Sequence, residues 1–124
     1  MESIGLVIVS HSKHIAEGVV ELISKVAKDV PITYVGGTEG GGIGTNFDQV
    51  DRVVSENPAD TLLAFFDLGS AKMNLKMVTD FSDKSIIINR VPIVEGAYNA
   101  AALLQAGAEL SVIQTQLAEL EINK

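Results

Sequence analysis

Short apolar runs rich in β-branched residues alternate four times along the chain with segments whose apolar residues recur at helical spacing. The expected strands are Ile4–Ser10, Ile32–Val35, Thr61–Phe66 and Ser85–Asn89. The expected helices extend from a Ser12 cap to about Lys28, from Phe47 to just before Asn57, over Gly69–Phe81, over Glu95–Gln105, and through Leu110, Ile113, Leu117 and Leu120. This alternation predicts right-handed crossovers and an α/β fold, a doubly wound, mostly parallel central sheet with helices on both faces.

The length and charge of the chain narrow the class of protein. A chain of 124 residues predicts one domain, residues 1–124, that can bury a single core. A net charge of −7 argues against nonspecific electrostatic binding to nucleic acid, and the absence of tryptophan argues against a base-stacking surface. Because the sequence has no cysteine, disulfides and thiolate metal sites are excluded.

The hydropathy of the sequence favours a cytoplasmic protein. No window approaches the roughly 18 consecutive apolar residues that a membrane helix needs. The first apolar stretch, Gly5–Val9, is too short for the core of a signal peptide. We therefore expect neither a membrane span nor a membrane partner.

Polar and glycine-rich segments follow each expected strand, and a parallel sheet brings such segments to one edge, where ligands bind in α/β folds. The segments are Ser10-His11-Ser12, the loop GGTEGGGIGTN at 36–46, DLGSA at 67–71 and NRVPIVEGA at 89–97. Each has a simpler interpretation, because a boundary histidine, Asp and Ser caps and flexible glycine loops are all common. Their convergence on one edge is what predicts a functional site there.

The chemistry that suits this edge is capture of a phosphoryl group by the imidazole of His11. Imidazole has an unperturbed pKa of about 6.5, so a neutral, nucleophilic ring is abundant near pH 7. If Asp67 accepts a hydrogen bond from Nδ1, the lone pair on Nε2 is aimed outward. The candidate phosphate-binding residues are Ser12, Gly42, Gly44, Thr45, Gly69 and Ser70. Transfer by positioning needs no metal, and we expect no tightly bound cofactor.

Other interpretations of these motifs agree less well with the sequence. His11 and His14 are too few for a zinc site, and the glycine loop lacks both the Gly-Lys-Ser/Thr of a P-loop and the spacing of a dinucleotide fingerprint. A receiver-like signalling domain phosphorylated on Asp67 would need an acidic cluster after the first strand, where this chain has Ser-His-Ser. A non-enzymatic module that binds a small molecule through the glycine loop is a further alternative.

Five segments together resemble the mannose-type enzyme IIA family of the bacterial phosphotransferase system (PTS). They are IVSHS (8–12), GGIGTN (41–46), FFDLGSA (65–71), VPIVEGA (91–97) and GAELSVI (107–113). The resemblance spans nearly the whole chain and is nearest to the branch that serves PTS-dependent dihydroxyacetone kinase. It implies that the phosphocarrier HPr phosphorylates His11 on Nε2 and that Asp67 is the partner of the ring.

The same resemblance implies the partners. In this branch the phosphoryl group passes to ADP bound to the DhaL subunit, and the ATP formed phosphorylates dihydroxyacetone held by DhaK. The family also implies a homodimer, and some of its members continue into fused modules similar to HPr and enzyme I. The alternative within the family is a sugar-transport enzyme IIA that hands the phosphoryl group to a IIB domain.

Overall fold

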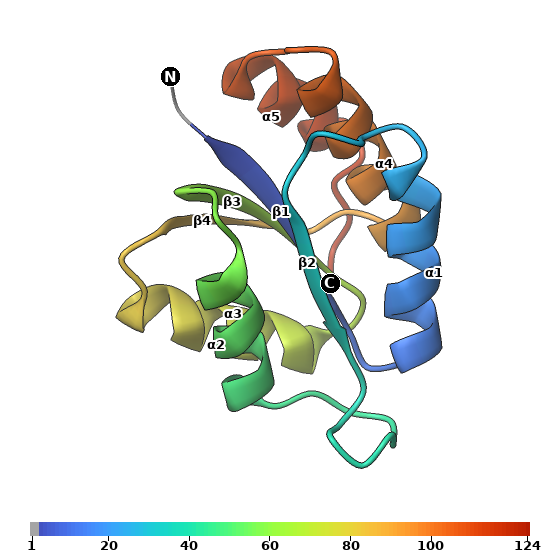
Figure 1. Cartoon of the computed structure of the whole chain (residues 1–124), viewed down its shortest axis with the longest axis vertical. Coiled ribbons are helices and arrows are strands. Elements are labelled where there is room, and N and C mark those ends of the chain that lie inside the picture. The colour runs from blue at the N-terminus through green and yellow to red at the C-terminus, as the bar shows by residue number, and fades with distance from the viewer. Residues whose placement is uncertain (1–2) are drawn as a thin grey trace.

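A parallel sheet of four strands forms the centre of the structure, a computed structural model that describes residues 3–124 (Figure 1). Its strands are β1 (Ile4–Ser10), β2 (Ile32–Gly36), β3 (Thr61–Phe66) and β4 (Ser85–Asn89). They lie in the order β2-β1-β3-β4, and each neighbouring pair is parallel. The α/β fold that the alternation of segments predicts is therefore confirmed.

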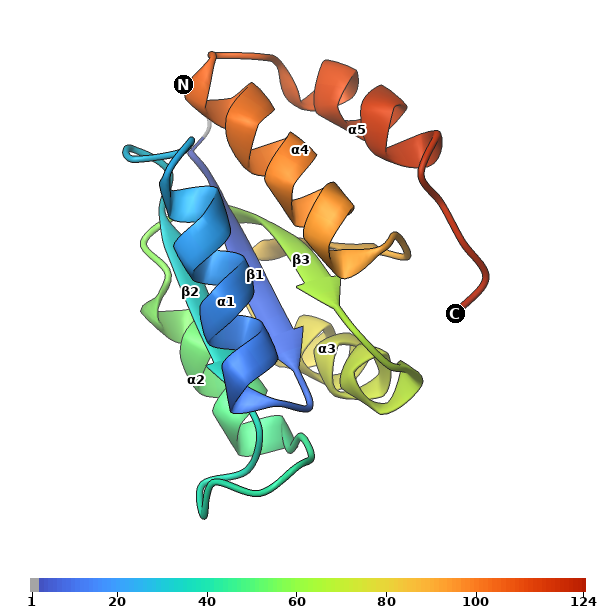
Figure 2. The same ribbon diagram turned by 90° about the vertical axis from the view of Figure 1, so that its right-hand side faces the viewer.

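Five helices cover both faces of this sheet: α1 (Lys13–Ser24), α2 (Phe47–Glu56), α3 (Gly69–Phe81), α4 (Ile93–Gln105) and α5 (Leu110–Ala118). Figures 1 and 2 show α1, α4 and α5 on one face and α2 and α3 on the other. No helix within residues 3–124 has the length and apolar character to cross a membrane.

Three helix boundaries differ from the expected ones. Helix α5 ends at Ala118, before Leu120, because the N–H groups of Glu119 and Leu120 bond to carbonyls three residues earlier. Helix α1 ends at Ser24, short of Lys28, because the next backbone N–H groups turn back to carbonyls three residues earlier and tighten the chain into turns. Helix α4 begins at Ile93, two residues before Glu95. The carbonyl of Pro92 accepts the first helical bond, from Gly96 N–H at 2.8 Å, so the proline serves as the cap.

The core has two layers because side chains along each central strand alternate between the faces of the sheet. In β1, Leu6 and Ile8 pack with α1, α4 and α5, whereas Val7 and Val9 pack with α2 and α3. All four of these side chains are completely buried. This burial on both faces explains why the central strands read as continuous apolar runs.

The strand register decides which loops meet. Val9 of β1 lies opposite Phe66 of β3, and Ser10 lies opposite Gly36 of β2. The residues that follow the three strands therefore emerge together at the carboxyl edge of the sheet. Gly36 is required here because a Cβ atom at this position would lie 2.7 Å from the Cα of Lys13, at the start of α1.

Candidate active site

The side chain of Asp67, directly after β3, is the centre of a hydrogen-bond network at the carboxyl edge. Its Oδ2 accepts from the Ser10 hydroxyl at 2.7 Å and from the His11 backbone N–H at 2.9 Å. Its Oδ1 accepts from the Leu68 backbone N–H at 2.7 Å and lies 2.8 Å from His11 Nδ1. An ionised carboxylate has about four acceptor positions, so these four bonds saturate it and fix its orientation.

The environment of Asp67 keeps it ionised. Burial by itself would raise the pKa of this carboxyl, but the hydrogen bonds from Ser10, His11 and Leu68 outweigh burial and hold the pKa below its ordinary value of 3.8. At neutral pH the carboxylate can therefore only accept hydrogen bonds. It follows that Nδ1 of His11 carries a hydrogen and donates it to Asp67.

With its hydrogen on Nδ1, the neutral ring of His11 has a free electron pair on Nε2. The hydroxyl of Ser70 lies 2.5 Å from this atom and donates a hydrogen bond to it. The His11 side chain is 15% exposed, and Ser70 is an exposed residue. The partner of Nε2 is therefore an exposed hydroxyl, which an incoming group can replace.

Two helices begin beside His11. Helix α1 starts at Lys13, and its cap Ser12 accepts a hydrogen bond from the Ile15 N–H at 3.4 Å. Helix α3 starts at Gly69, where the cap Leu68 provides no side-chain bond to the first amides. The amino end of a helix carries a partial positive charge, so both helices favour an anion close to Nε2.

The glycine-rich loop after β2 folds back onto His11. Gly44, at φ +146°, donates its N–H to the carbonyl of His11 at 2.9 Å, in a backbone conformation that favours glycine. Thr45 is joined to α3 through Asn74, whose Nδ2 lies 3.3 Å from the Thr45 hydroxyl. Gly42 is turned into the loop itself, where its N–H and carbonyl both bond to Thr38.

The structure thus brings together the residues that the sequence selected from three separate loops. His11, Asp67 and Ser70 are in direct contact, Gly69 begins the helix below them, and Ser12 caps the helix beside them. A phosphate contact from Ser12, Gly42, Gly44, Thr45, Gly69 or Ser70 stays a prediction.

Ser10 is the residue that sequence reasoning underrated. It is buried, and its hydroxyl both donates to Asp67 and accepts from the Ser12 N–H at 3.1 Å. The sequence offers one signal for this role: a polar residue at the buried end of an otherwise apolar strand needs an internal partner. His14, by contrast, is an exposed residue of α1.

Comparison with known proteins identifies the class to which this fold and site belong. A sequence model of the EIIA-man family, described as the PTS system fructose IIA component, matches residues 5–114. This range includes the segments that hold His11, Asp67 and the glycine-rich loop. The chain therefore belongs to the EIIA-man family.

Individual relatives narrow the comparison. The chain is 53% identical over 120 residues to the phosphotransferase subunit DhaM of PTS-dependent dihydroxyacetone kinase from Lactococcus lactis, covering 97% of this chain and 98% of the relative. It is 49% identical to the phosphoryl donor subunit DhaM of PEP-dependent dihydroxyacetone kinase 1 from Listeria innocua, covering 95% of both chains. A crystal structure of a protein of unknown function has a TM-score of 0.84 and 26% identity, covering 98% and 97% of the two chains.

Proposed function

We propose that this protein is the phosphoryl donor subunit of a PEP-dependent dihydroxyacetone kinase. It accepts a phosphoryl group from HPr on Nε2 of His11 and passes it to ADP bound to DhaL, which works with DhaK. The observation that carries the proposal is the pair of contacts on the His11 ring, with Asp67 on Nδ1 and an accessible hydroxyl on Nε2. The high identity to two DhaM subunits over nearly the whole chain supports the choice of kinase system.

The acceptance step follows from the tautomer of His11. The electron pair on Nε2 attacks the phosphorus of the phosphohistidine on HPr. As the new P–Nε2 bond forms, the P–N bond to the donor breaks, and its electron pair returns to the donor imidazole. The hydrogen on Nδ1 stays in place, and the positive charge that develops on the ring is stabilised by Asp67 at 2.8 Å.

The donation step reverses the roles. A β-phosphate oxygen of ADP attacks the phosphorus, the P–Nε2 bond breaks, and its electron pair returns to the ring. Since Asp67 stabilises the ring without sharing its proton, neutral His11 is regenerated with its hydrogen still on Nδ1. Donors at the start of α3 and the Ser70 hydroxyl hold the phosphoryl oxygens between the two steps. The subunit carries the phosphoryl group, and the DhaL and DhaK partners complete the kinase reaction.

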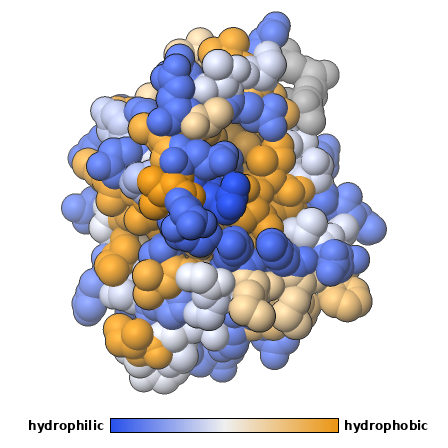
Figure 3. Space-filling view, turned by 180° about the vertical axis from the view of Figure 1, so that it is seen from behind, coloured by the Kyte–Doolittle hydropathy of each residue, from blue (hydrophilic) through white to orange (hydrophobic). Residues whose placement is uncertain are grey.

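The homodimer that family membership implies is part of this proposal. Strand β4 lies at one edge of the sheet, and its isoleucines Ile86, Ile87 and Ile88 are only half-buried. Figure 3 shows the face opposite that of Figure 1, where hydrophobic side chains gather around a hydrophilic centre. A second copy packed on the β4 side would cover this apolar surface. Light scattering should give twice the chain mass at micromolar concentration, and a monomer mass there would contradict a stable dimer.

The experiment that tests the proposed function is a two-stage transfer. The full chain is incubated with radiolabelled phosphorylated HPr, and the modified residue is mapped by mass spectrometry under alkaline conditions. We expect label on His11 that survives alkali and is lost in acid, as for phosphohistidine. Label on Asp67 that alkali or hydroxylamine removes would overturn the proposal in favour of an acyl phosphate.

The second stage identifies the acceptor. The phosphorylated protein is added in parallel to DhaL with ADP and to a IIB domain, and loss of label is followed against time. We expect prompt ATP formation with DhaL. Because the family description names a fructose IIA component, transfer only to the IIB domain is the outcome that would replace the kinase role with sugar transport.

A further inference from the structure

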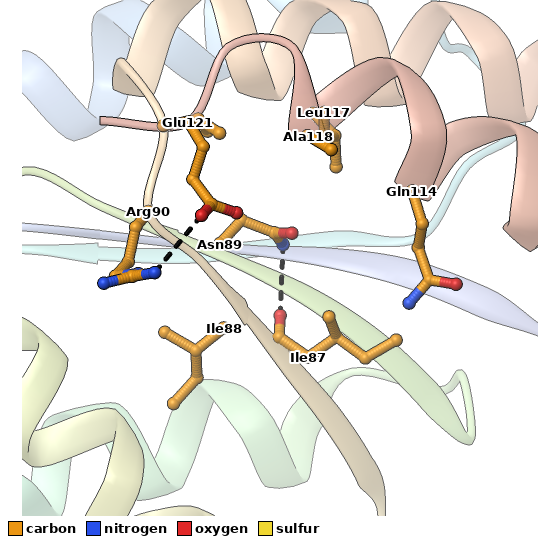
Figure 4. A pocket seen from close by; sticks show the side chains of 9 residues that line it. Ile87, Ile88, Asn89, Arg90, Gln114, Leu117, Ala118 and Glu121 are labelled. Atoms are coloured by element: carbon orange, nitrogen blue, oxygen red, sulfur yellow. Dashed lines mark hydrogen bonds and ion pairs between the residues drawn. The ribbon is translucent and has the colours of Figure 1, made fainter. Parts of the chain in front are cut away.

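The segment after α5 returns to the carboxyl edge of the sheet. Figures 1 and 2 show residues 119–124 passing from α5 to a point close to the end of β3. On the way, Ile122 N–H bonds to the Arg90 carbonyl at 2.9 Å, and the Arg90 guanidinium pairs with Glu121 at 3.2 Å. Figure 4 shows this ion pair at the rim of a groove of about 320 Å³ between β4 and α5. The segment is thus anchored before it reaches its last residue.

The side chain of that last residue, Lys124, is held next to the active site. Its ammonium group donates to the carbonyl of Phe66 at 2.6 Å and lies 4.4 Å from the centroid of the Phe66 ring. From α3, the ammonium group of Lys72 donates to the Lys124 backbone oxygen at 2.9 Å. Because Phe66 directly precedes Asp67, a positive charge is fixed one residue from the carboxylate that holds His11.

Two opposing effects act on the pKa of Lys124. Burial lowers the pKa of the Lys124 ammonium, while the negative charge of Asp67 opposes that fall. The charged side chains that interact with it in the described structure are Asp67, at the end of β3, and Lys72, which bonds to its backbone on the α3 side. The charged side chain in contact with the His11 ring is Asp67.

We propose that Lys124 is a positioning residue of the His11 site, because its ammonium, fixed at the Phe66 carbonyl, offsets part of the Asp67 charge. An uncompensated carboxylate would favour a protonated His11 ring, which cannot attack phosphorus. With Lys124 in place, Asp67 still orients the ring, while part of the negative charge that favours ring protonation is offset. This inference rests on the proposed function and adds a residue that lies 57 positions from Asp67 in the chain.

The test compares Lys124→Gln, Lys124→Arg and a matched control, Lys76→Gln, at an exposed position of α3. Initial rates of phosphoryl transfer from HPr to each full-length variant are measured from pH 5.5 to 8.5, with thermal unfolding followed in parallel. For Lys124→Gln we expect the acid limb of the profile to move up by about half a pH unit and the rate at pH 6 to fall about threefold. Lys124→Arg should keep the pH–rate profile of the wild type, and so should Lys76→Gln.

Two results would overturn the inference. One is a pH–rate profile of Lys124→Gln whose acid limb lies at the same pH as that of the wild type. The other is a uniform loss of rate at every pH together with a lower unfolding temperature, which indicates a purely structural role for the last residue.

A second measurement separates this inference from the proposed function. The carbon-bound protons of the His11 ring are titrated by NMR in the unphosphorylated wild type and in Lys124→Gln, so that no partner is needed. We expect the midpoint in Lys124→Gln to lie about half a pH unit higher, and an unchanged midpoint would refute the role of Lys124. If HPr failed to phosphorylate any variant while the midpoint moved, only the proposed function would be refuted.

Discussion

Two polar side chains organise opposite edges of the same sheet, the half-buried Asp67 at the carboxyl edge and the buried Asn57 at the amino edge. Asn57 is 1% exposed, and its Nδ2 donates to the Leu6 carbonyl at 3.0 Å and to the Thr33 hydroxyl at 3.3 Å. Its Oδ1 accepts from the Ala59 N–H at 3.0 Å, and Lys84 donates to its carbonyl. Each of these contacts stays within the fold.

The Asp67 network differs in how it ends. It consists of half-buried and exposed bonds, and it ends on His11, whose Nε2 accepts a hydrogen bond from the exposed hydroxyl of Ser70. A polar network whose groups are all paired internally can contribute only stability and geometry. A network that ends on an accessible nitrogen can hold a reactive atom in place. The five predictions below test this difference, beginning with the largest expected effect.

Removing the reactive nitrogen should abolish function and leave the fold intact. In His11→Gln we expect no detectable phosphoryl acceptance from HPr, because the amide has no nucleophilic nitrogen in place of Nε2. Filter-bound radiolabel measures acceptance, and circular dichroism checks the fold. His14→Gln, at an exposed position of the same segment, should accept phosphate at close to the wild-type rate, and acceptance by His11→Gln would contradict the site.

Asp67→Asn should slow transfer by about 100-fold, which is the low end of what a positioned acid–base partner contributes. The amide group brings hydrogens toward the Ser10 and His11 donors, so that the ring loses both its fixed orientation and the charge that stabilises it. Single-turnover kinetics with phosphorylated HPr measure the rate, and Asp80→Asn on α3 is the matched control. A normal rate in Asp67→Asn would exclude Asp67 from the mechanism.

The amino-edge network should show the opposite behaviour. Asn57→Ala leaves the Leu6 carbonyl and the Ala59 N–H without their buried partner, so we expect the free energy of unfolding to fall by about 2 kcal/mol. Urea denaturation measures this change. The transfer rate per folded molecule should stay at the wild-type value, and a specific loss of rate would show that the two edges are coupled.

Ser70→Ala should have a smaller effect, about a threefold loss of transfer rate. The hydroxyl contributes a hydrogen bond to Nε2 and then to the phosphoryl group, but it lies at the surface, where water can replace it. The same single-turnover assay measures the rate, with Ser111→Ala on α5 as the control. A rate increase would mean that the hydroxyl mainly blocks Nε2 in the resting protein.

The last prediction concerns acid. Because the pKa of Asp67 lies below 3.8 in the folded protein, its bonds contribute stability that is present above the unfolded value and lost as the pH falls through the folded value. The difference in unfolding free energy between wild type and Asp67→Asn should therefore shrink as the pH is lowered from 6 to 2.5. Urea denaturation at both pH values measures it, and an equal difference would contradict the assignment.

The sequence predicted the helices and strands of this fold better than it predicted which strands lie next to one another in the sheet. Apolar runs and helical spacing located all four strands and five helices, because burial on one or both faces leaves a local pattern. The strand order β2-β1-β3-β4 leaves no such pattern. The contact between His11 and Asp67 could be anticipated because both residues follow strands of one parallel sheet.

Other features of the site depend on contacts that no local pattern encodes. Ser10 has the spacing of a cap, and its bond to Asp67 becomes visible only with β3 in place. Lys124 resembles any solvated lysine until the chain brings it to Phe66. Helix α1 ends at Ser24 because of local turn bonds, and helix α4 begins at Ile93 because Pro92 caps it. The periodicity of apolar residues contains neither signal.

The pairing of Val9 with Phe66 has a consequence for how the protein matures. The two halves of the reactive pair are 56 residues apart and come from strands that are parallel, so they can meet only after α1, β2 and α2 have been passed. A nascent or partly folded chain that has not joined its first and third strands in this alignment offers only an untethered histidine. Competence to carry phosphate should therefore arise late, together with completion of the sheet, and could serve as a sensitive reporter of it.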